Sequence, residues 1–237
     1  MGTLGDNTII VVLGPTSSGK SSLAVKLAKR FDGEVVSADS RQVYKGMDIG
    51  SGKITEEEME GIPHHLLNVA SPKRRFDLSR YQKLAEKEID RIIKRSKLPI
   101  VCGGTAFYTK ALTEGMILSD IKPDWKLREK LEKKSKEELF NILSSLDPKR
   151  AEKIEKDNPR RLIRAIEIVT KSNQPVPKIK KNPKYRVIKI GIKKETEELN
   201  RLIKKRLIER LNQGMIEETM RLRDEGLSWK RIDSFGL

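Results

Sequence analysis

A loop that could bind phosphate lies near the N-terminus. Residues 14–21 (GPTSSGKS) match the pattern G-x-x-x-x-G-K-[ST] at every fixed position. In such a loop the glycines let successive backbone N–H groups point at phosphate oxygens, and the helix that follows adds partial positive charge. The lysine supplies a full charge, and the last hydroxyl can ligate Mg²⁺. The segment predicts a site for a phosphorylated ligand, formed by Gly14, Pro15, Thr16, Ser17, Ser18, Gly19, Lys20 and Ser21.

Two more polar residues, Asp39 and Thr105, follow predicted strands at 33–37 and 98–102. ATPases and GTPases with this loop usually carry a metal-binding Asp after a later apolar strand, but here the strand at 98–102 is followed by Gly-Gly-Thr. Because ligands of open parallel sheets bind at the carboxyl ends of the strands, we expect Asp39, Thr105 and the loop to meet in one cleft. Asp39 could hold Mg²⁺ indirectly, act as a general base, or cap the segment that follows it.

The elements that must position these residues alternate between strand and helix. Apolar, β-branched runs typical of strands buried on both faces alternate with segments of helical spacing. The predicted strands are 8–13, 33–37 and 98–102, and the predicted helices are 21–31 and 80–94. This order predicts an α/β fold with a parallel sheet.

The pattern changes between residues 121 and 184, where only helical segments are expected. These are 126–134, 136–146, 149–156 and 160–171. A strand at 185–192 then returns to the sheet, and 195–226 is a charged helical region with a break near Gly214. We therefore expect a core formed by residues 1–120 and 185–237, with an all-helical domain inserted at 121–184.

Charge separates these two parts. The chain holds 50 Lys and Arg against 34 Asp and Glu, a net charge of +16. The predicted insertion carries 19 basic and 10 acidic residues, a net +9, and the remaining residues carry +7. Such an excess favours a polyanionic partner, most often nucleic acid. We expect the basic insertion to hold it.

Several classes of protein are disfavoured by the composition. No apolar run approaches the ~20 residues that span a bilayer, and the first residues lack the features of a signal peptide. One cysteine cannot form an internal disulfide, and two histidines cannot build a zinc cluster. We expect a cytoplasmic protein without membrane contact. Cys102 is expected to be a buried, unreactive thiol, and Phe107, Tyr108 and Trp125 are expected to lie in the core.

Five segments together resemble one enzyme family, the bacterial tRNA dimethylallyltransferases, also called tRNA isopentenyltransferases. They are GPTSSGKS (14–21), SADSRQVYKGMDIGSGK (37–53), IPHHLL (62–67), GGTAFY (103–108) and DNPRRLIRAIE (157–167). The resemblance implies a P-loop NTPase-like parallel sheet core with an inserted all-helical domain. It also implies transfer of a dimethylallyl group from dimethylallyl diphosphate to the exocyclic N6 amine of adenosine 37 of tRNA, beside the anticodon, with release of pyrophosphate and a requirement for Mg²⁺.

The resemblance assigns roles to individual residues. Asp39 would be the general base, Thr105 would orient the amine and a diphosphate oxygen, and Lys20 and Arg206 would reach the diphosphate. Ser21 would ligate Mg²⁺. The residues expected to contact the anticodon stem-loop are Asp39, Ser40, Arg41, Gln42, Thr105, Arg128, Arg160, Arg161 and Arg164. The enzyme is expected to be a monomer.

Two other functions remain open from the sequence. A small-molecule P-loop kinase shares the loop and a similar sheet, although the basic insertion is large for a kinase lid. A non-catalytic RNA-binding module with a vestigial loop is the second alternative. Members of the family usually continue for several dozen residues beyond the position of Leu237, and we expect loss of that segment to weaken tRNA binding.

Overall fold

The computed structural model describes residues 7–236 of the chain. It divides into two units: Met1–Met116 with Asn182–Leu237 form the first, and Ile117–Lys181 form the second. The sequence analysis predicted an insertion at 121–184, so its start was expected four residues later and its end three residues later than the structure has them. A two-stranded sheet of β5 (Met116–Ile117) and β6 (Lys180–Lys181) lies where the chain passes between the units. The expectation of helices alone within 121–184 was therefore wrong at β6.

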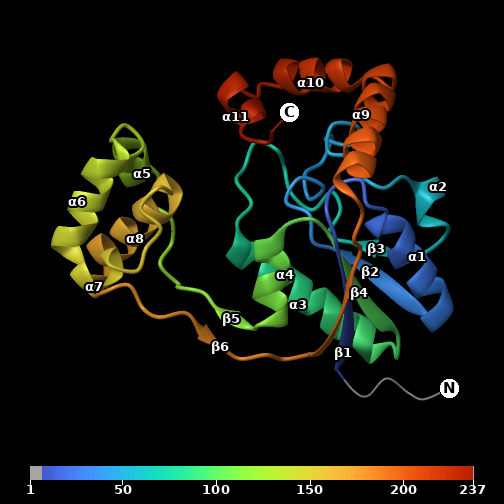
Figure 1. Cartoon of the computed structure of the whole chain (residues 1–237), viewed down its shortest axis with the longest axis horizontal. Coiled ribbons are helices and arrows are strands. Elements are labelled where there is room, and N and C mark those ends of the chain that lie inside the picture. The colour runs from blue at the N-terminus through green and yellow to red at the C-terminus, as the bar shows by residue number, and fades with distance from the viewer. Residues whose placement is uncertain (1–6, 237) are drawn as a thin grey trace. The chain divides into compact units, whose positions relative to one another are not determined.

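A five-stranded parallel sheet forms the centre of the first unit (Figure 1). Its order is β3 (His64–His65), β2 (Gly33–Ser37), β4 (Leu98–Cys102), β1 (Thr8–Leu13) and β7 (Arg186–Gly191). β1 pairs with β4 and β7, and β2 pairs with β3 and β4, all in parallel. The predicted α/β fold is confirmed. Only the short β3 was not expected, because two residues carry no periodic signal.

Helices cover both faces of this sheet, as the alternation of β1 side chains shows. Ile9 and Val11 pack with α3 (Leu78–Lys94) and α4 (Ala106–Thr113), whereas Ile10 and Val12 pack with α1 (Lys20–Phe31). The four side chains are nearly inaccessible to solvent. Burial on both faces explains why the strand is a continuous β-branched run.

The C-terminal part of the first unit is helical. α9 (Thr196–Asn212) and α10 (Met215–Asp224) are separated at Gly214, whose φ of 96° is readily adopted only by glycine. The predicted break at this residue is confirmed. α10 and α11 (Trp229–Asp233) pack onto the segment after β2, where Leu222 lies in one apolar cluster with Tyr44 and Met47. A short helix, α2 (Glu56–Met59), completes this segment.

The second unit is a small helical domain with its own core. It contains α5 (Trp125–Leu131), α6 (Lys136–Leu146), α7 (Pro148–Ala151) and α8 (Pro159–Ser172). Its core includes the fully buried Leu139, Leu143 and Leu162. α7 is shorter than the predicted 149–156. Trp125 and Phe107 are about half exposed, so their expected burial was wrong, whereas Tyr108 is buried as expected.

Among residues 7–236, no helix has the length and apolar composition needed to cross a membrane.

Candidate functional site

The predicted phosphate loop connects β1 to α1 and has the backbone conformation of an anion-binding loop. Ser17 and Gly19 both have positive φ, 61° and 90°. Alternation of such residues turns successive backbone N–H groups toward one side. The Ser18 hydroxyl is buried, and no group among the described residues hydrogen-bonds to it. Because buried polar atoms rarely lack partners, this hydroxyl indicates that the loop is built for a polar ligand.

Lys20 begins α1 and stays close to the loop. Its Nζ donates a hydrogen bond of 2.5 Å to the Pro15 carbonyl oxygen. Burial lowers the pKa of Lys20, and the nearby Arg206 lowers it further, whereas the negative charge of Asp39 acts in the opposite direction. The ammonium thus lies within electrostatic range of both residues.

Asp39 occupies the carboxyl end of β2 and forms a turn with the residues that follow. Its Oδ1 accepts hydrogen bonds from the backbone N–H groups of Arg41 (2.8 Å) and Gln42 (3.4 Å). Its Oδ2 has no hydrogen-bond partner among the described residues. The turn fixes the carboxylate through one oxygen and leaves the other available. Capping the next segment and acting as a base are therefore compatible roles.

Thr105 ties the ends of β2 and β4 together. Its Oγ1 accepts a hydrogen bond of 2.9 Å from the Ser40 N–H and donates one of 3.2 Å to the Ser40 hydroxyl. Its own N–H donates to the Ala38 carbonyl at 3.1 Å. Gly103 permits this approach, since a Cβ there would lie 2.2 Å from the Ala38 carbonyl carbon. Asp39 is thereby held between Ala38 and Ser40, which both hydrogen-bond to Thr105.

The phosphate loop and Asp39 border one cavity of about 450 Å³. The predicted site residues that line it are Thr16, Ser17, Ser18, Gly19, Lys20, Ser21, Asp39, Arg41, Gln42 and Arg206. Gly14, Pro15, Ser40 and Thr105 are not in the lining, although Thr105 hydrogen-bonds to Ser40 beside it. The structure thus brings ten of the predicted residues to one place.

Two arginines of α9 reach this cavity, and the sequence reasoning found only one of them. The Arg206 Nη1 lies 3.4 Å from the Ser17 hydroxyl, and the Arg210 Nη1 donates a hydrogen bond of 3.3 Å to the Gly50 carbonyl. Burial lowers the pKa of Arg210, and the neighbouring Arg206 lowers it too, whereas Asp39 acts oppositely. The missed signal was the i, i+4 spacing of the two arginines, which places both on one helical face.

Few side chains of this cavity could coordinate a Mg²⁺ ion directly. The described residues contain no group of three or more His, Cys, Asp or Glu side chains arranged to hold a metal ion. The cavity does offer the exposed Ser21 hydroxyl, a hard oxygen donor. This donor fits Mg²⁺, which is commonly bound by one or two side chains together with substrate phosphates.

Cys102, at the end of β4, also lines the cavity but is not a reactive group. It is buried, and burial raises its pKa to about 11, against the opposing charge of Lys20. A thiol in that state is not a nucleophile at neutral pH. The predicted burial of this thiol is confirmed.

The predicted RNA-contacting arginines of the second unit have different surroundings. Arg128 and Arg164 both pair with Glu167, which is fully buried; the Arg128 Nη2 lies 2.6 Å from its Oε2. Burial alone would raise the pKa of Glu167, but hydrogen bonds from Arg128, the Asp124 N–H and Arg164 lower it to about 2. These two arginines thus stabilise the domain. Two more arginines at the start of α8 are exposed: Arg160 and Arg161, the latter 2.7 Å from Glu155.

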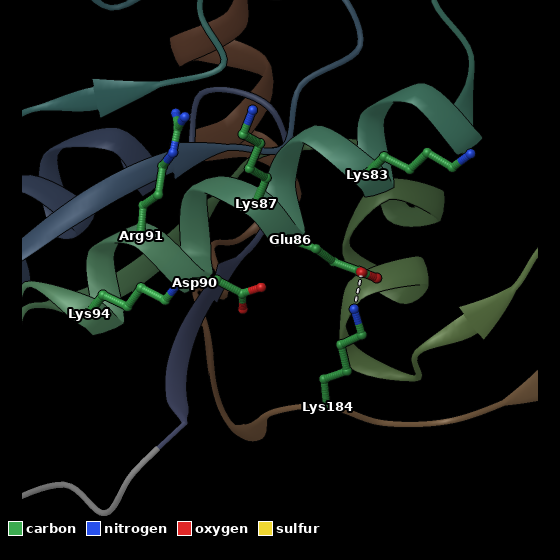
Figure 2. A pocket seen from close by; sticks show the side chains of 7 residues that line it. All are labelled: Lys83, Glu86, Lys87, Asp90, Arg91, Lys94 and Lys184. Atoms are coloured by element: carbon green, nitrogen blue, oxygen red, sulfur yellow. Dashed lines mark hydrogen bonds and ion pairs between the residues drawn. The ribbon is translucent and has the colours of Figure 1, made fainter.

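A second hollow, of about 430 Å³, lies along α3 and contains none of the predicted site residues (Figure 2). Its carboxylates are already engaged: Glu86 pairs with Lys184, and Asp90 accepts a hydrogen bond of 2.9 Å from the Tyr185 hydroxyl. The lining residues are Lys83, Glu86, Lys87, Asp90, Arg91, Lys94 and Lys184. This is an exposed charged face, whereas the chemistry-bearing residues gather at the cavity beside the loop.

Comparison with known proteins identifies the family of this chain. A family model described as IPP transferase matches residues 42–236. The tRNA dimethylallyltransferase of Acetivibrio thermocellus is 43% identical over 240 residues, which cover 98% of this chain and 77% of that protein.

Two solved structures are also similar. The full-length tRNA isopentenylpyrophosphate transferase of Bacillus halodurans is 38% identical, with a TM-score of 0.68 over 94% of this chain and 72% of that one. A eukaryotic dimethylallyltransferase described as acting on tRNA is 30% identical, with a TM-score of 0.80 over 93% of this chain and 56% of that one. The family model covers most of the chain, and the identities are high over nearly its whole length. The chain therefore belongs to the IPP transferase family, which includes the tRNA dimethylallyltransferases.

Proposed function

We propose that this chain transfers a dimethylallyl group from dimethylallyl diphosphate to the N6 amine of adenosine 37 of tRNA, releasing pyrophosphate. Its relatives are named tRNA dimethylallyltransferases. The observation that carries the proposal is that the phosphate loop and Asp39 border the same cavity. The loop suits a diphosphate, and Asp39 offers a base for an amine.

At the diphosphate end, the chain must stabilise negative charge that grows on the leaving group. When the C1–O bond of the substrate breaks, its electron pair stays with pyrophosphate. The loop N–H groups, Lys20, Arg206 and Arg210 are donors and cations at this place, and such groups act most strongly where charge develops in the transition state. Mg²⁺ bound at Ser21 would add charge stabilisation there. The loop would thus serve in alkyl transfer without any phosphoryl transfer.

At the acceptor end, the adenine amine is a weak nucleophile because its lone pair is delocalised into the ring. As N6 forms its bond to C1 of the dimethylallyl group, the nitrogen must lose a proton, and the free Oδ2 of Asp39 would accept it. The two hydrogen bonds between Thr105 and Ser40 hold the peptide that follows Asp39. Thr105 would also orient the amine.

The RNA must present an unstacked base, because an adenine inside a stacked loop is out of reach of the cavity. Arg41 and Gln42 border the cavity and are placed to contact that base or its neighbours. On the second unit, we propose contacts to the anticodon stem-loop from Arg160 and Arg161, with Arg128 and Arg164 adding to the basic field. The proposal is of a monomeric enzyme in the cytoplasm.

The test is an assay with dimethylallyl diphosphate labelled in the allyl group and a tRNA with A36 and A37. We expect label in the RNA and pyrophosphate release only when both substrates and Mg²⁺ are present. A tRNA with G37 is the matched control and should take up no label. Steady ATP hydrolysis without RNA would favour a kinase, and tRNA binding without label transfer would favour a non-catalytic RNA-binding module.

A further inference from the structure

A buried carboxylate lies against the loop that borders the cavity. Glu218, in the first turn of α10, is 3% exposed. Its Oε2 accepts hydrogen bonds from the backbone N–H groups of Asp48 (2.7 Å) and Ile49 (2.9 Å), and its Oε1 accepts one from Gly50 (2.9 Å). Three successive N–H groups directed at one anion form a backbone nest, which is occupied here by a side chain of the same protein.

The nest is the partner that makes this burial tolerable. An ionised carboxylate removed from water is strongly destabilising unless hydrogen bonds compensate it. The Arg221 guanidinium lies 4.0 Å from Glu218 on an exposed side chain, whereas the three N–H groups lie within 2.9 Å. The three hydrogen bonds therefore compensate the burial of Glu218 and, at the same time, fix the backbone of residues 48–50.

The loop that Glu218 holds also borders the cavity. Gly50, Ser51 and Gly52 line it, and the carbonyl of Gly50 accepts the hydrogen bond from Arg210. Gly52 lies so close to that arginine that a Cβ would be 1.7 Å from its Nη2. A displacement of the 48–50 backbone would consequently move the group that fixes the Arg210 guanidinium.

We propose that Glu218 is a positioning residue for the diphosphate end of the cavity. It fixes the backbone of residues 48–50, so that the Gly50 carbonyl holds Arg210 in the orientation that meets the ligand. The inference rests on the proposed function, because Arg210 is taken there as a diphosphate contact. It assigns a role in substrate binding to a side chain that does not line the cavity.

The test measures binding of inorganic pyrophosphate with Mg²⁺ by calorimetry, on the full chain. In Glu218→Gln, at least one of the three N–H groups faces an amide NH₂ in place of an acceptor. We expect Kd for pyrophosphate to rise about tenfold, as for loss of a hydrogen bond to a charged group. The neighbouring Glu217 is exposed, so Glu217→Gln is the matched control and should bind like the wild type.

A double-mutant cycle with Arg210→Ala separates positioning from general stability. If Glu218 acts through Arg210, then Glu218→Gln should add little further loss to Arg210→Ala. Losses that add in full, or wild-type affinity in Glu218→Gln, would overturn the inference. Failure of the wild type to bind pyrophosphate would contradict the proposed function itself, and this role with it.

Hydrogen exchange on the wild type covers the case in which Glu218→Gln does not fold. The amides of Asp48, Ile49 and Gly50 should be protected in the free protein, because a carboxylate oxygen accepts each of them. Pyrophosphate should increase this protection. Exchange at the rate of an unprotected loop would overturn the inference without any variant.

Discussion

The backbone N–H of Ser40 donates a hydrogen bond of 2.9 Å to the hydroxyl oxygen of Thr105, joining residues 65 positions apart in the chain. The bond ties the turn after β2 to the end of β4. Because Asp39 lies directly before Ser40, the position of the candidate base depends on a side chain that follows a different strand. The position of this candidate base is thus linked to the parallel pairing of β2 with β4.

Replacing Thr105 tests whether the position of Asp39 depends on the Thr105 hydroxyl. Thr105→Val leaves the partly buried Ser40 N–H without its acceptor, which costs about 1–3 kcal/mol. We expect the transfer rate to fall roughly 10- to 100-fold. Thr105→Ser keeps the hydroxyl and should retain most activity. Single-turnover transfer of labelled dimethylallyl groups measures both, and equal rates for the two variants would contradict the role.

Arg210 should matter as much as the arginine that the family resemblance pointed to. Arg210→Ala removes one guanidinium from the diphosphate end, and loss of one such donor lowers kcat/KM by roughly 100-fold. Arg201, on the same helix, is exposed, so Arg201→Ala should leave kcat/KM unchanged. Steady-state kinetics with varied dimethylallyl diphosphate measures the effect, and equal values for the two variants would exclude Arg210 from the site.

The sheet and the phosphate loop could be predicted from the sequence because both depend on local residue patterns. The apolar run of β1 and the glycine spacing of the loop need no knowledge of distant residues. The contacts of Glu218 with residues 48–50 and of Arg210 with Gly50 span 160 residues or more, and no local pattern encodes them. Likewise, the sequence predicts Arg128 as an RNA-contacting residue, and only the structure shows that it pairs with the buried Glu167.

The ion cluster of the second unit should make its stability depend on pH. The folded-state pKa of Glu167, about 2, lies below its ordinary value of 4.5. The stabilisation is therefore complete above pH 4.5 and is lost as the pH falls toward 2. Glu167→Gln should lower the free energy of unfolding by about 3 kcal/mol at pH 7 and by less than half of that at pH 3. Urea unfolding followed by circular dichroism measures this.

Exposed Glu152 provides the comparison for that experiment. Glu152→Gln should change the free energy of unfolding little at either pH. A loss in Glu167→Gln that stays constant between pH 7 and pH 3 would contradict the assigned pKa of Glu167.

Salt should weaken tRNA binding steeply, through release of counterions from the RNA. We expect lysines of the second unit to account for more of this dependence than lysines of the first. Replacing exposed Lys133, Lys149 and Lys153 by Gln should reduce the slope of log Kd against log salt by about 1–2.

The three exposed lysines on α3 form the matched set: Lys83, Lys87 and Lys94 (Figure 2). Their replacement by Gln removes the same charge and should change the slope less. Filter binding from low to moderate salt gives both slopes, and a larger change from the α3 set would contradict the proposed role of the second unit.

The most direct test of the account is transfer by Asp39→Asn. Asparagine keeps an oxygen that can accept the Arg41 and Gln42 N–H groups, but it puts an amide NH₂ where the free carboxylate oxygen lies. Single-turnover transfer from labelled dimethylallyl diphosphate to tRNA should fall by about 10²- to 10⁴-fold, while affinity for tRNA and for pyrophosphate stays that of the wild type. Transfer at the wild-type rate would contradict the assignment of Asp39 as the base.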